Sequence, residues 1–233
     1  MKIVYPVSYS SWSYYTDCPK KYHYNYILKC KQPSTFALEK GNTWHKNCEV
    51  FIKEENTDLI DKLEIWRVML TTLKHNKAFA EQRMAVNEKM QPLPWRSKDS
   101  IVRWIIDARY YDENTRILKV IDFKTGKEYP NHTEQMEFYA CFLYGVLKKE
   151  IPINKVVCEL WYLDIPKIVT LTLSLDFLDN LRDHYLREFN EAKSVVDFPT
   201  TPSASACKWC PYSVKRRNTL TIPEGGYCQD YFK

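Results

Sequence analysis

The chain has 233 residues, of which 45% are apolar, 15% are aromatic and only five are glycine. This composition excludes a disordered, collagen-like or low-complexity chain, and the length is sufficient for a large core without covalent cross-links. The net charge of +5, from 34 basic and 29 acidic residues, permits a nucleic-acid partner without requiring one. The sequence holds no run of about 18 apolar residues, so we expect no membrane span.

The N-terminal segment, residues 1–6, lacks the apolar core of a signal peptide, so we expect a cytoplasmic protein. Thiols stay reduced in that compartment. The eight cysteines therefore predict buried or metal-binding thiols rather than a disulfide framework.

Secondary-structure signals alternate between helical and extended patterns along the chain. A serine near residue 8 predicts the cap of a short helix, and Pro19 predicts the end of that helix and the start of another. Apolar spacing then predicts helices and strands, with Asn131 as a helix cap and an irregular tail from Thr200. The expected helices are 39–54, 58–78, 131–149 and 173–193, and the expected strands are 81–87, 101–111, 116–123, 155–163 and 167–172. Helices before, between and after strands predict a mixed α/β fold.

The central hairpin carries two acidic side chains in apolar surroundings. If Glu113 and Asn114 form its loop, Asp107 lies opposite Val120 and shares one face with Asp122 and Lys124. Asp107 and Asp122 are then diagonal neighbours, roughly 7–8 Å apart. Two carboxylates at this separation can bind one Mg or Mn ion, which activates a water, and an amine beside it can orient that water.

The alternative for Asp122-x-Lys124 is a surface salt bridge, which is common in proteins. Asp122 ends the apolar run 117–121, however, and Asp107 follows the apolar run 104–106. A carboxylate at the end of a buried strand needs a partner, so this context favours a functional pair.

Four short segments combine into a larger pattern. They are, in chain order, Gly41-Asn42-Thr43-Trp44-His45, Ile106-Asp107-Ala108-Arg109, Ile121-Asp122-Phe123-Lys124-Thr125-Gly126 and Gln135-Met136-Glu137-Phe138-Tyr139. Their order and spacing resemble RecB-like nucleases of the PD-(D/E)XK superfamily over roughly residues 8–230, with motifs G-x-x-x-H, G-x-I/V-D, D-x-K-T-G and Q-x-x-x-Y. Trp104 replaces the usual small residue of the second motif.

The resemblance implies a restriction-endonuclease-like core, in which helices flank a central mixed sheet. It implies a single nuclease domain over residues 1–233. Its parts would be an N-terminal helical part at 1–78, a nuclease core at 79–195 and a cysteine-rich tail at 196–233.

The resemblance also implies a role for each matching residue. Asp107 and Asp122 would be metal ligands, completed by His45 and by the backbone carbonyl of Phe123. Lys124 would orient or activate the attacking water.

Gln135 and Tyr139, four residues apart on one helix face, would contact the DNA backbone or the site. Their alternative is ordinary helix packing, and the alternative for His45 is a structural hydrogen-bonded histidine. Glu81 or Glu88 matches a weaker acidic position of the family, and the sequence leaves that choice open.

Cys207 and Cys210 have the C-x-x-C spacing that lets two thiolates bind one metal or cluster. This pattern resembles the iron–sulfur RecB-type nucleases, including AddB and the CRISPR-associated exonucleases. The resemblance implies a 4Fe-4S cluster completed by Cys18 and Cys228, with zinc or no metal as alternatives. The insertion 213–227 is longer than the family's usual gap, so Cys30 is the next candidate for the fourth ligand. We expect Cys30, Cys48, Cys141 and Cys158 otherwise to be core residues.

The sequence therefore predicts a Mg- or Mn-dependent DNA exonuclease that acts on single strands or duplex ends. Recombination or CRISPR-adaptation proteins, or further copies of the chain, are its expected partners. A phage or CRISPR-associated origin fits the resemblance, with the host cytoplasm as the location if the protein is viral. The rival hypothesis is a catalytically inactive DNA-binding or assembly protein that keeps the fold and the cluster, against which the joint presence of Asp107, Asp122 and Lys124 argues.

Overall fold

A computed structural model describes residues 4–30, 32, 34–54, 57–195, 197–203, 207–208, 210–213 and 228. The chain forms two compact units. The larger is Ser34–Arg187, and the smaller joins Met1–Pro33 to Glu188–Lys233. No helix among the described residues is both long and apolar enough to cross a membrane.

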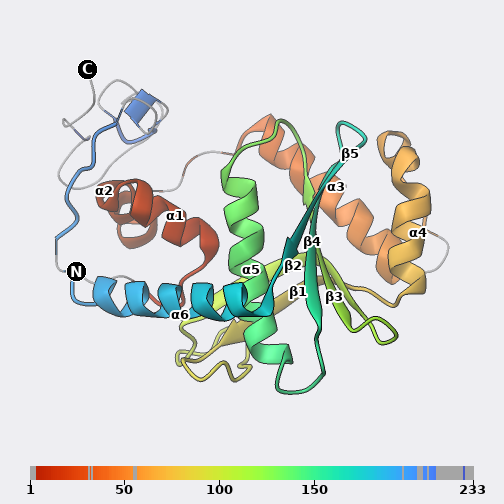
Figure 1. Ribbon diagram of the computed structural model, residues 1–233. Helices are drawn as coiled ribbons and strands as arrows, with labels where there is room; N and C mark the ends of the chain where they lie inside the picture. Colours follow the sequence, from red (N-terminus) through yellow and green to blue (C-terminus); the bar gives the residue numbers. More distant parts are fainter. Residues whose placement is uncertain are drawn as a thin grey trace. The chain divides into compact units, whose positions relative to one another are not determined.

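A five-stranded sheet in the order β1-β2-β3-β4-β5 forms the centre of the larger unit (Figure 1). Neighbouring strands are antiparallel except for β3 and β4, which are parallel. The predicted mixed sheet is confirmed. Its strands are β1 (Phe79–Val86), β2 (Val102–Asp112), β3 (Ile117–Lys124), β4 (Lys155–Tyr162) and β5 (Lys167–Leu173).

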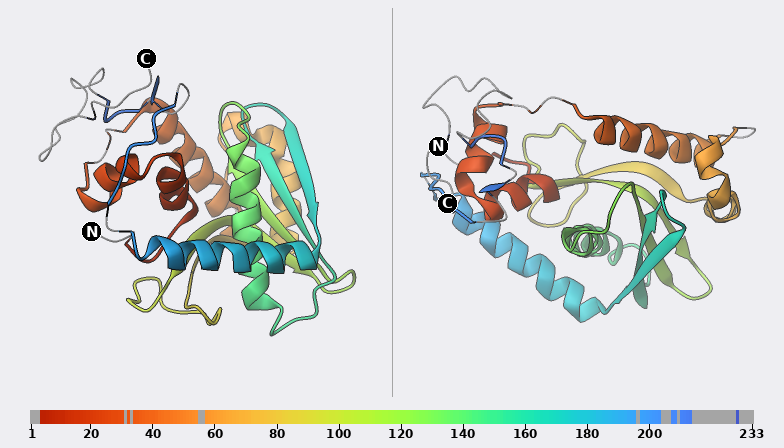
Figure 2. Two further views of the ribbon diagram at one scale, coloured as in Figure 1. Left: turned by 60° about the vertical axis from the view of Figure 1, so that its left-hand side comes forward. Right: turned by 90° about the horizontal axis from the view of Figure 1, so that it is seen from above.

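Helices cover both faces of this sheet. The right-hand view of Figure 2 shows α3 on one side of the strands and α5 on the other. The helices are α3 (Phe36–Lys53), α4 (Arg67–His75), α5 (Asn131–Leu147) and α6 (Leu175–Ala192), with a 3-10 turn η2 (Asp61–Trp66) before α4. This arrangement confirms the expected α/β architecture.

Two helix starts differ from the sequence prediction. The helix expected from residue 58 becomes α-helical only at Arg67, because Asn47 bonds the backbone of Asp58 and Ile60 and holds that segment extended. The last expected helix-cap residue, Asn131, lies inside α5. Pro130 takes the cap position there, without a side-chain cap bond.

The core under α3 and α4 is rich in aromatic side chains. Trp66 and Trp161 stack with ring centroids 5.6 Å apart, and Trp66 Nε1 donates to the Leu163 carbonyl at 3.3 Å. Both rings are almost fully buried. Burial of large apolar side chains contributes about 1.5–3 kcal/mol each, so this stack holds η2 against β4. The expected core cysteines Cys30, Cys48, Cys141 and Cys158 are all buried.

The β2–β3 hairpin has a longer loop than the sequence suggested. The Asp112 carboxylate accepts bonds from the backbone N–H groups of Asn114 and Thr115 and from the Thr115 hydroxyl. Asp112 therefore pairs with Ile117, and the loop spans 113–116. The expected pairing of Asp107 with Val120 is wrong. The register continues to Asp122 instead, and because it shifts by two residues, the alternation of faces is preserved.

The smaller unit begins with α1 (Tyr9–Asp17), α2 (Pro19–Tyr22) and a π-helical turn η1 (His23–Ile27). Ser8 caps α1 in a reciprocal capping box with Ser11, and Pro19 is the first residue of α2. Both predictions for this segment are confirmed.

Candidate active site and cysteine site

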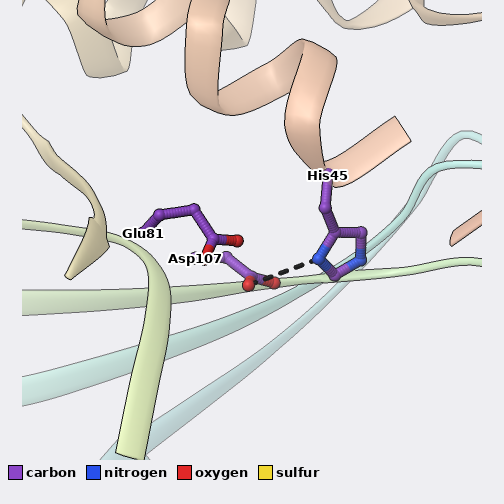
Figure 3. A group of neighbouring side chains, drawn as sticks. All are labelled: His45, Glu81 and Asp107. Carbon is purple, nitrogen blue, oxygen red and sulfur yellow. Dashed lines mark ion pairs between the residues drawn. The ribbon is translucent and has the colours of Figure 1, made fainter. Parts of the chain in front are cut away.

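Three potential metal ligands converge above the sheet of the larger unit. His45 extends from α3, Glu81 from β1 and Asp107 from β2, and one ligand atom of each lies within 4.8 Å of the others (Figure 3). His45 Nδ1 is 3.3 Å from Asp107 Oδ1. One nitrogen and two carboxylate donors can coordinate a divalent cation.

Glu81 occupies an unusual backbone position. Its φ of +49° lies in the left-handed region, which side chains other than glycine rarely adopt. The flanking residues Ala80 and Gln82 pair with Ala108 and Ile106, whereas Glu81 and Asp107 make no ladder pair. At this irregular point of β1 the Glu81 carboxylate is directed toward His45 and Asp107.

The electrostatics of the site reflect its crowded negative charge. Burial alone would lower the pKa of His45, but the adjacent Asp107 carboxylate outweighs it and raises the pKa to about 9. Burial, followed by repulsion from Asp107, raises the pKa of Glu81. Burial also raises the pKa of Asp122, opposed by Lys124 and reinforced by Asp107. Such a group of acids gains from a bound cation.

Lys124 connects the acidic cluster to α5. Its Nζ lies 2.6 Å from Asp122 Oδ2 and donates to Gln135 Oε1 at 2.6 Å. Gln135 Nε2 in turn donates to the Tyr139 hydroxyl at 2.7 Å. Burial raises the pKa of Tyr139, so its hydroxyl stays protonated near neutral pH. The continuous chain of contacts fixes the position of the lysine ammonium.

Asp107 is held from the opposite side. Its Oδ2 accepts a hydrogen bond of 2.6 Å from the backbone N–H of Phe123, while Oδ1 faces His45. One side chain therefore links the strand that carries Asp122 to the helix that carries His45.

Gly41 explains how α3 approaches the site so closely. A Cβ atom at this position would lie 3.1 Å from Thr125 Oγ1, in the turn that follows β3. His45 is four residues further along α3 and so lies on the same helix face. The turn itself is anchored by Asp164, which accepts from the Gly126 N–H and pairs with Lys40. Gly126 has a φ of +94°, which glycine adopts without strain.

Comparison with known proteins identifies the family. The family model of the PD-(D/E)XK nuclease superfamily matches residues 6–214. The chain belongs to the PD-(D/E)XK nuclease superfamily. The crystal structure of SSO0001 is similar at 16% sequence identity and a TM-score of 0.46, covering 95% of this chain and 90% of that one. A search of curated proteins gives no significant match.

Membership of the PD-(D/E)XK superfamily indicates a metal-dependent nuclease with DNA as its substrate. Of the expected metal ligands, the structure brings His45 and Asp107 together. Asp122 Oδ2 lies outside that group of three, and its ion pair with Lys124 is its only polar contact among the described residues. Glu81, which the sequence left undecided against Glu88, joins the group. No sequence signal could separate the two acids, because the left-handed backbone at residue 81 depends on pairing with β2.

Three cysteines of the smaller unit of this PD-(D/E)XK chain, Cys30, Cys210 and Cys228, lie in or against one small core cluster. The Tyr212 hydroxyl donates to the Cys30 carbonyl at 2.9 Å, and its ring stacks on Tyr24 at 5.1 Å. Tyr24, Cys30 and Tyr212 form a small buried cluster, with Cys210 and Cys228 packed against it. The C-x-x-C segment therefore folds back onto the N-terminal helices.

Cys228 rejoins this segment after the insertion. Its backbone N–H donates to the Tyr212 carbonyl at 2.9 Å, and it forms a parallel bridge with Ser213. Burial raises the pKa of the Cys210 thiol, and Cys18 and Cys207 add smaller contributions in the same direction. None of the four expected cluster cysteines, all of them among the described residues, forms a disulfide, and all four are partly exposed.

Proposed function

We propose that this PD-(D/E)XK chain is a Mg- or Mn-dependent exonuclease that hydrolyses phosphodiester bonds at DNA ends. The observation that carries the proposal is the convergence of His45, Glu81 and Asp107 beside the Asp122–Lys124 pair. A bare salt bridge would need neither the histidine nor two further acids. Crowding of buried acids is costly unless a cation is bound between them.

The donor set fits a small divalent ion. Carboxylate oxygens suit Mg and Mn, and the His45 nitrogen favours Mn over Mg. Asp122 offers a buried carboxylate oxygen whose contacts among the described residues are limited to Lys124. We propose His45, Asp107, Asp122 and the Phe123 carbonyl as ligands, with Glu81 as an additional one. A bound cation of this class polarises a phosphoryl oxygen and lowers the pKa of a water.

Lys124 and its helix partners orient the reactants in this proposal. The Lys124 ammonium is a donor held at a fixed point by Asp122 and Gln135. A fixed donor can orient a water or stabilise charge that develops on the phosphate without reorganising during the reaction. Gln135 holds the lysine, and Tyr139 holds Gln135, so both act as positioning residues.

The decisive experiment compares linear and circular DNA. End-labelled single-stranded and duplex substrates, and a covalently closed circle, are incubated with the full-length protein in a titration of Mg or Mn. Degradation of linear DNA only, with labelled mononucleotides released first, supports the exonuclease. Cleavage of the circle would instead establish an endonuclease. DNA binding without hydrolysis at any metal concentration would favour a catalytically inactive binding or assembly protein.

We further propose that Cys18, Cys207, Cys210 and Cys228 bind a 4Fe-4S cluster, as in the iron–sulfur RecB-like nucleases. The gathering of Cys210 and Cys228 against the N-terminal Tyr24 and Cys30 supports this. A tetrahedral zinc site, with Zn–S bonds near 2.3 Å, would hold its sulfurs about 3.8 Å apart. In the described part of the chain no three cysteine sulfurs come within 4.8 Å of one another. A 4Fe-4S cluster binds each thiolate to a separate iron, so its four sulfurs need not surround a single ion.

Metal analysis separates the two possible occupants of the cysteine site. Protein purified without oxygen should be brown and contain about four iron and four sulfide per chain. A colourless protein with one zinc would replace the cluster by a structural zinc site and leave the nuclease proposal intact.

A role with phage recombination or CRISPR-adaptation proteins, or as a homo-oligomer, follows from the same resemblance and is tested by copurification from the native host.

A further inference from the structure

An aromatic side chain in the loop between β1 and β2 is flanked by two guanidinium groups, one from each of the strands that carry Glu81 and Asp107. The Trp95 ring has Arg83 Cζ at 5.9 Å and Arg103 Cζ at 5.3 Å from its centroid. Arg96 and Lys98 follow it in the same loop. Among the described residues, Arg83, Arg96, Lys98 and Arg103 form no ion pair, whereas many other lysines and arginines of the larger unit are paired with acids.

The loop that carries Trp95 is tightly structured. Its chain bonds back to the end of β1, where Leu93 N–H donates to the Ala85 carbonyl and Ile101 N–H to the Val86 carbonyl, each at 2.8 Å. Within the loop, Ser97 N–H donates to the Pro94 carbonyl at 2.8 Å and closes a turn around Trp95. The indole is therefore presented in a fixed position. It is half-buried, and Arg83 is exposed.

The arginines stand at short, defined intervals from the acidic site. Arg83 follows Glu81 by two residues on β1, and Arg103 precedes Asp107 by four on β2. At about 3.3 Å per residue these intervals are roughly 7 and 13 Å along the strands. β3 ends at Lys124, so in the register that pairs Ala108 with Ile121 it has no residue opposite Arg103. β2 therefore extends past the end of β3 at Arg103.

We propose that Trp95, Arg83 and Arg103 form a binding site for single-stranded nucleic acid. A base stacks on the indole, and the two guanidinium groups bind the phosphates on either side of it. Two cations beside one ring repel each other, and a phosphate strand removes that repulsion. The proposal rests on the proposed nuclease function and identifies the part of the substrate that this surface holds.

A single strand is the ligand that this chemistry selects. The faces of paired bases are covered in a duplex, so only an unpaired base can stack on a protein ring. The distance of roughly 13 Å corresponds to about four nucleotides at 3.4 Å each, and to fewer if the strand is extended. A strand with a phosphate in the acidic site must therefore extend by a few nucleotides before it contacts Arg103 and Trp95.

Four variants separate stacking from charge. Trp95→Ala removes the stacking surface, and Trp95→Phe retains an aromatic face. The double change Arg83→Gln and Arg103→Gln removes both phosphate contacts. Lys155→Gln is the matched control. It removes one exposed positive charge at the opposite end of β3 and β4, where Lys155 pairs with Ile117.

Binding is measured by fluorescence anisotropy with labelled oligothymidylates in EDTA, so that the readout does not depend on hydrolysis. For a strand of about 20 nucleotides, Trp95→Ala should weaken binding about tenfold, the usual loss for one stacked base. Its salt dependence should remain that of the wild type, and Trp95→Phe should restore most of the affinity. The double arginine variant should lower the slope of log K against log salt by about 1.4, or 0.7 per phosphate contact.

Hydrolysis gives an independent readout. The Trp95 and arginine variants should cleave bis(p-nitrophenyl) phosphate, which has no base, as fast as the wild type does, and should lose efficiency only on strands longer than about four nucleotides. Wild-type affinity of Trp95→Ala for long strands, or an equal loss in Lys155→Gln, would overturn the inference. If the wild type hydrolyses nothing, the proposed function fails, while the anisotropy series still decides whether this surface binds single strands.

Discussion

Glu81 on β1 lies opposite Asp107 on the neighbouring strand β2, and its backbone at that position is left-handed. For a side chain other than glycine this conformation costs about 1–2 kcal/mol. Strained residues of this kind concentrate at functional sites, where the surrounding fold holds them in place. Here the surrounding ladder pairs on both sides of Glu81 fix the backbone, and the carboxylate meets His45 and Asp107.

We therefore predict that the backbone conformation of residue 81 determines stability and that its carboxylate determines activity. Glu81→Gly should be more stable than Glu81→Ala by about 1 kcal/mol, the reverse of the usual order in a strand, because only glycine adopts this φ freely. Urea denaturation of the two variants measures the difference. Glu81→Gln should keep the fold and lose most metal-dependent hydrolysis.

The Glu81 prediction has an internal control in the metal itself. Mn should raise the melting temperature of the wild-type protein more than that of Glu81→Gln, because a lost ligand weakens the linkage between binding and stability. Equal metal-induced shifts in both proteins, together with full activity of Glu81→Gln, would remove Glu81 from the site.

Much of the fold, and the acidic pair, could be predicted from the sequence. Alternating apolar runs indicated the strands, and four motifs in the right order, one of them around Asp122 and Lys124, indicated the superfamily. The hairpin register could not be predicted, because it depends on the Asp112 carboxylate, which bonds three donors in a four-residue loop. Even so, a shift of two residues keeps every side chain on its face.

Contacts between distant parts of the chain also could not be predicted from the sequence. Arg83 and Arg103 are twenty residues apart in the chain, and only the register of β1 with β2 brings both to Trp95. The role of Gly41 was likewise recognisable only as part of a motif. Its physical reason, the close approach of Thr125, is a contact between a helix and a distant turn.

The Asp122–Lys124 pair should be essential for hydrolysis and nearly neutral for binding. Asp122→Asn and Lys124→Ala should each lower the cleavage rate by at least about 100-fold, the scale of loss for one charge-stabilising group. DNA affinity should change little, because phosphate contacts spread over the surface dominate it. Rates and affinities are measured on the same labelled strand. Asp61→Asn, an exposed acid on η2, is the control and should match the wild type; cleavage at the wild-type rate by either site variant would contradict the assignment.

His45 should determine which metal the protein prefers. His45→Ala removes the nitrogen donor, and we expect a higher metal concentration for half-maximal activity. Excess Mn should rescue the variant better than excess Mg, because Mn binds nitrogen ligands more strongly. Activity is followed across both metal titrations, with circular dichroism as the check on folding. An unchanged metal requirement in a folded variant would return His45 to a purely structural role.

Gly41 and Thr125 should be energetically coupled. In a helix interior, alanine is normally more stable than glycine by about 1 kcal/mol. At residue 41 the new methyl group would press on Thr125 Oγ1 at 3.1 Å, so Gly41→Ala should gain less than this or lose stability. When Thr125→Ala removes the hydroxyl, the same change should recover the full gain. Denaturation of the four proteins of this double-mutant cycle measures the coupling, and additive effects would show that the contact is unimportant.

Cys228 and Cys30 are the two candidates for the fourth cluster ligand, and the structure separates their surroundings. Cys228 is tied by its backbone to Tyr212 and Ser213, directly after the C-x-x-C segment, and its thiol is partly exposed. The Cys30 thiol is buried and lies 3.9 Å from the Leu28 carbonyl, as expected of a core cysteine.

We expect Cys228→Ser to lose most of the iron and the brown colour. Cys30→Ser should keep about four iron per chain and lose only modest stability, since serine replaces a small buried side chain. Iron and sulfide analysis of both variants, purified without oxygen beside Cys158→Ser as the core-cysteine control, decides between them. Retention of all iron in Cys228→Ser with loss in Cys30→Ser would reverse the assignment, and loss in neither would leave the cluster without its fourth proposed thiolate.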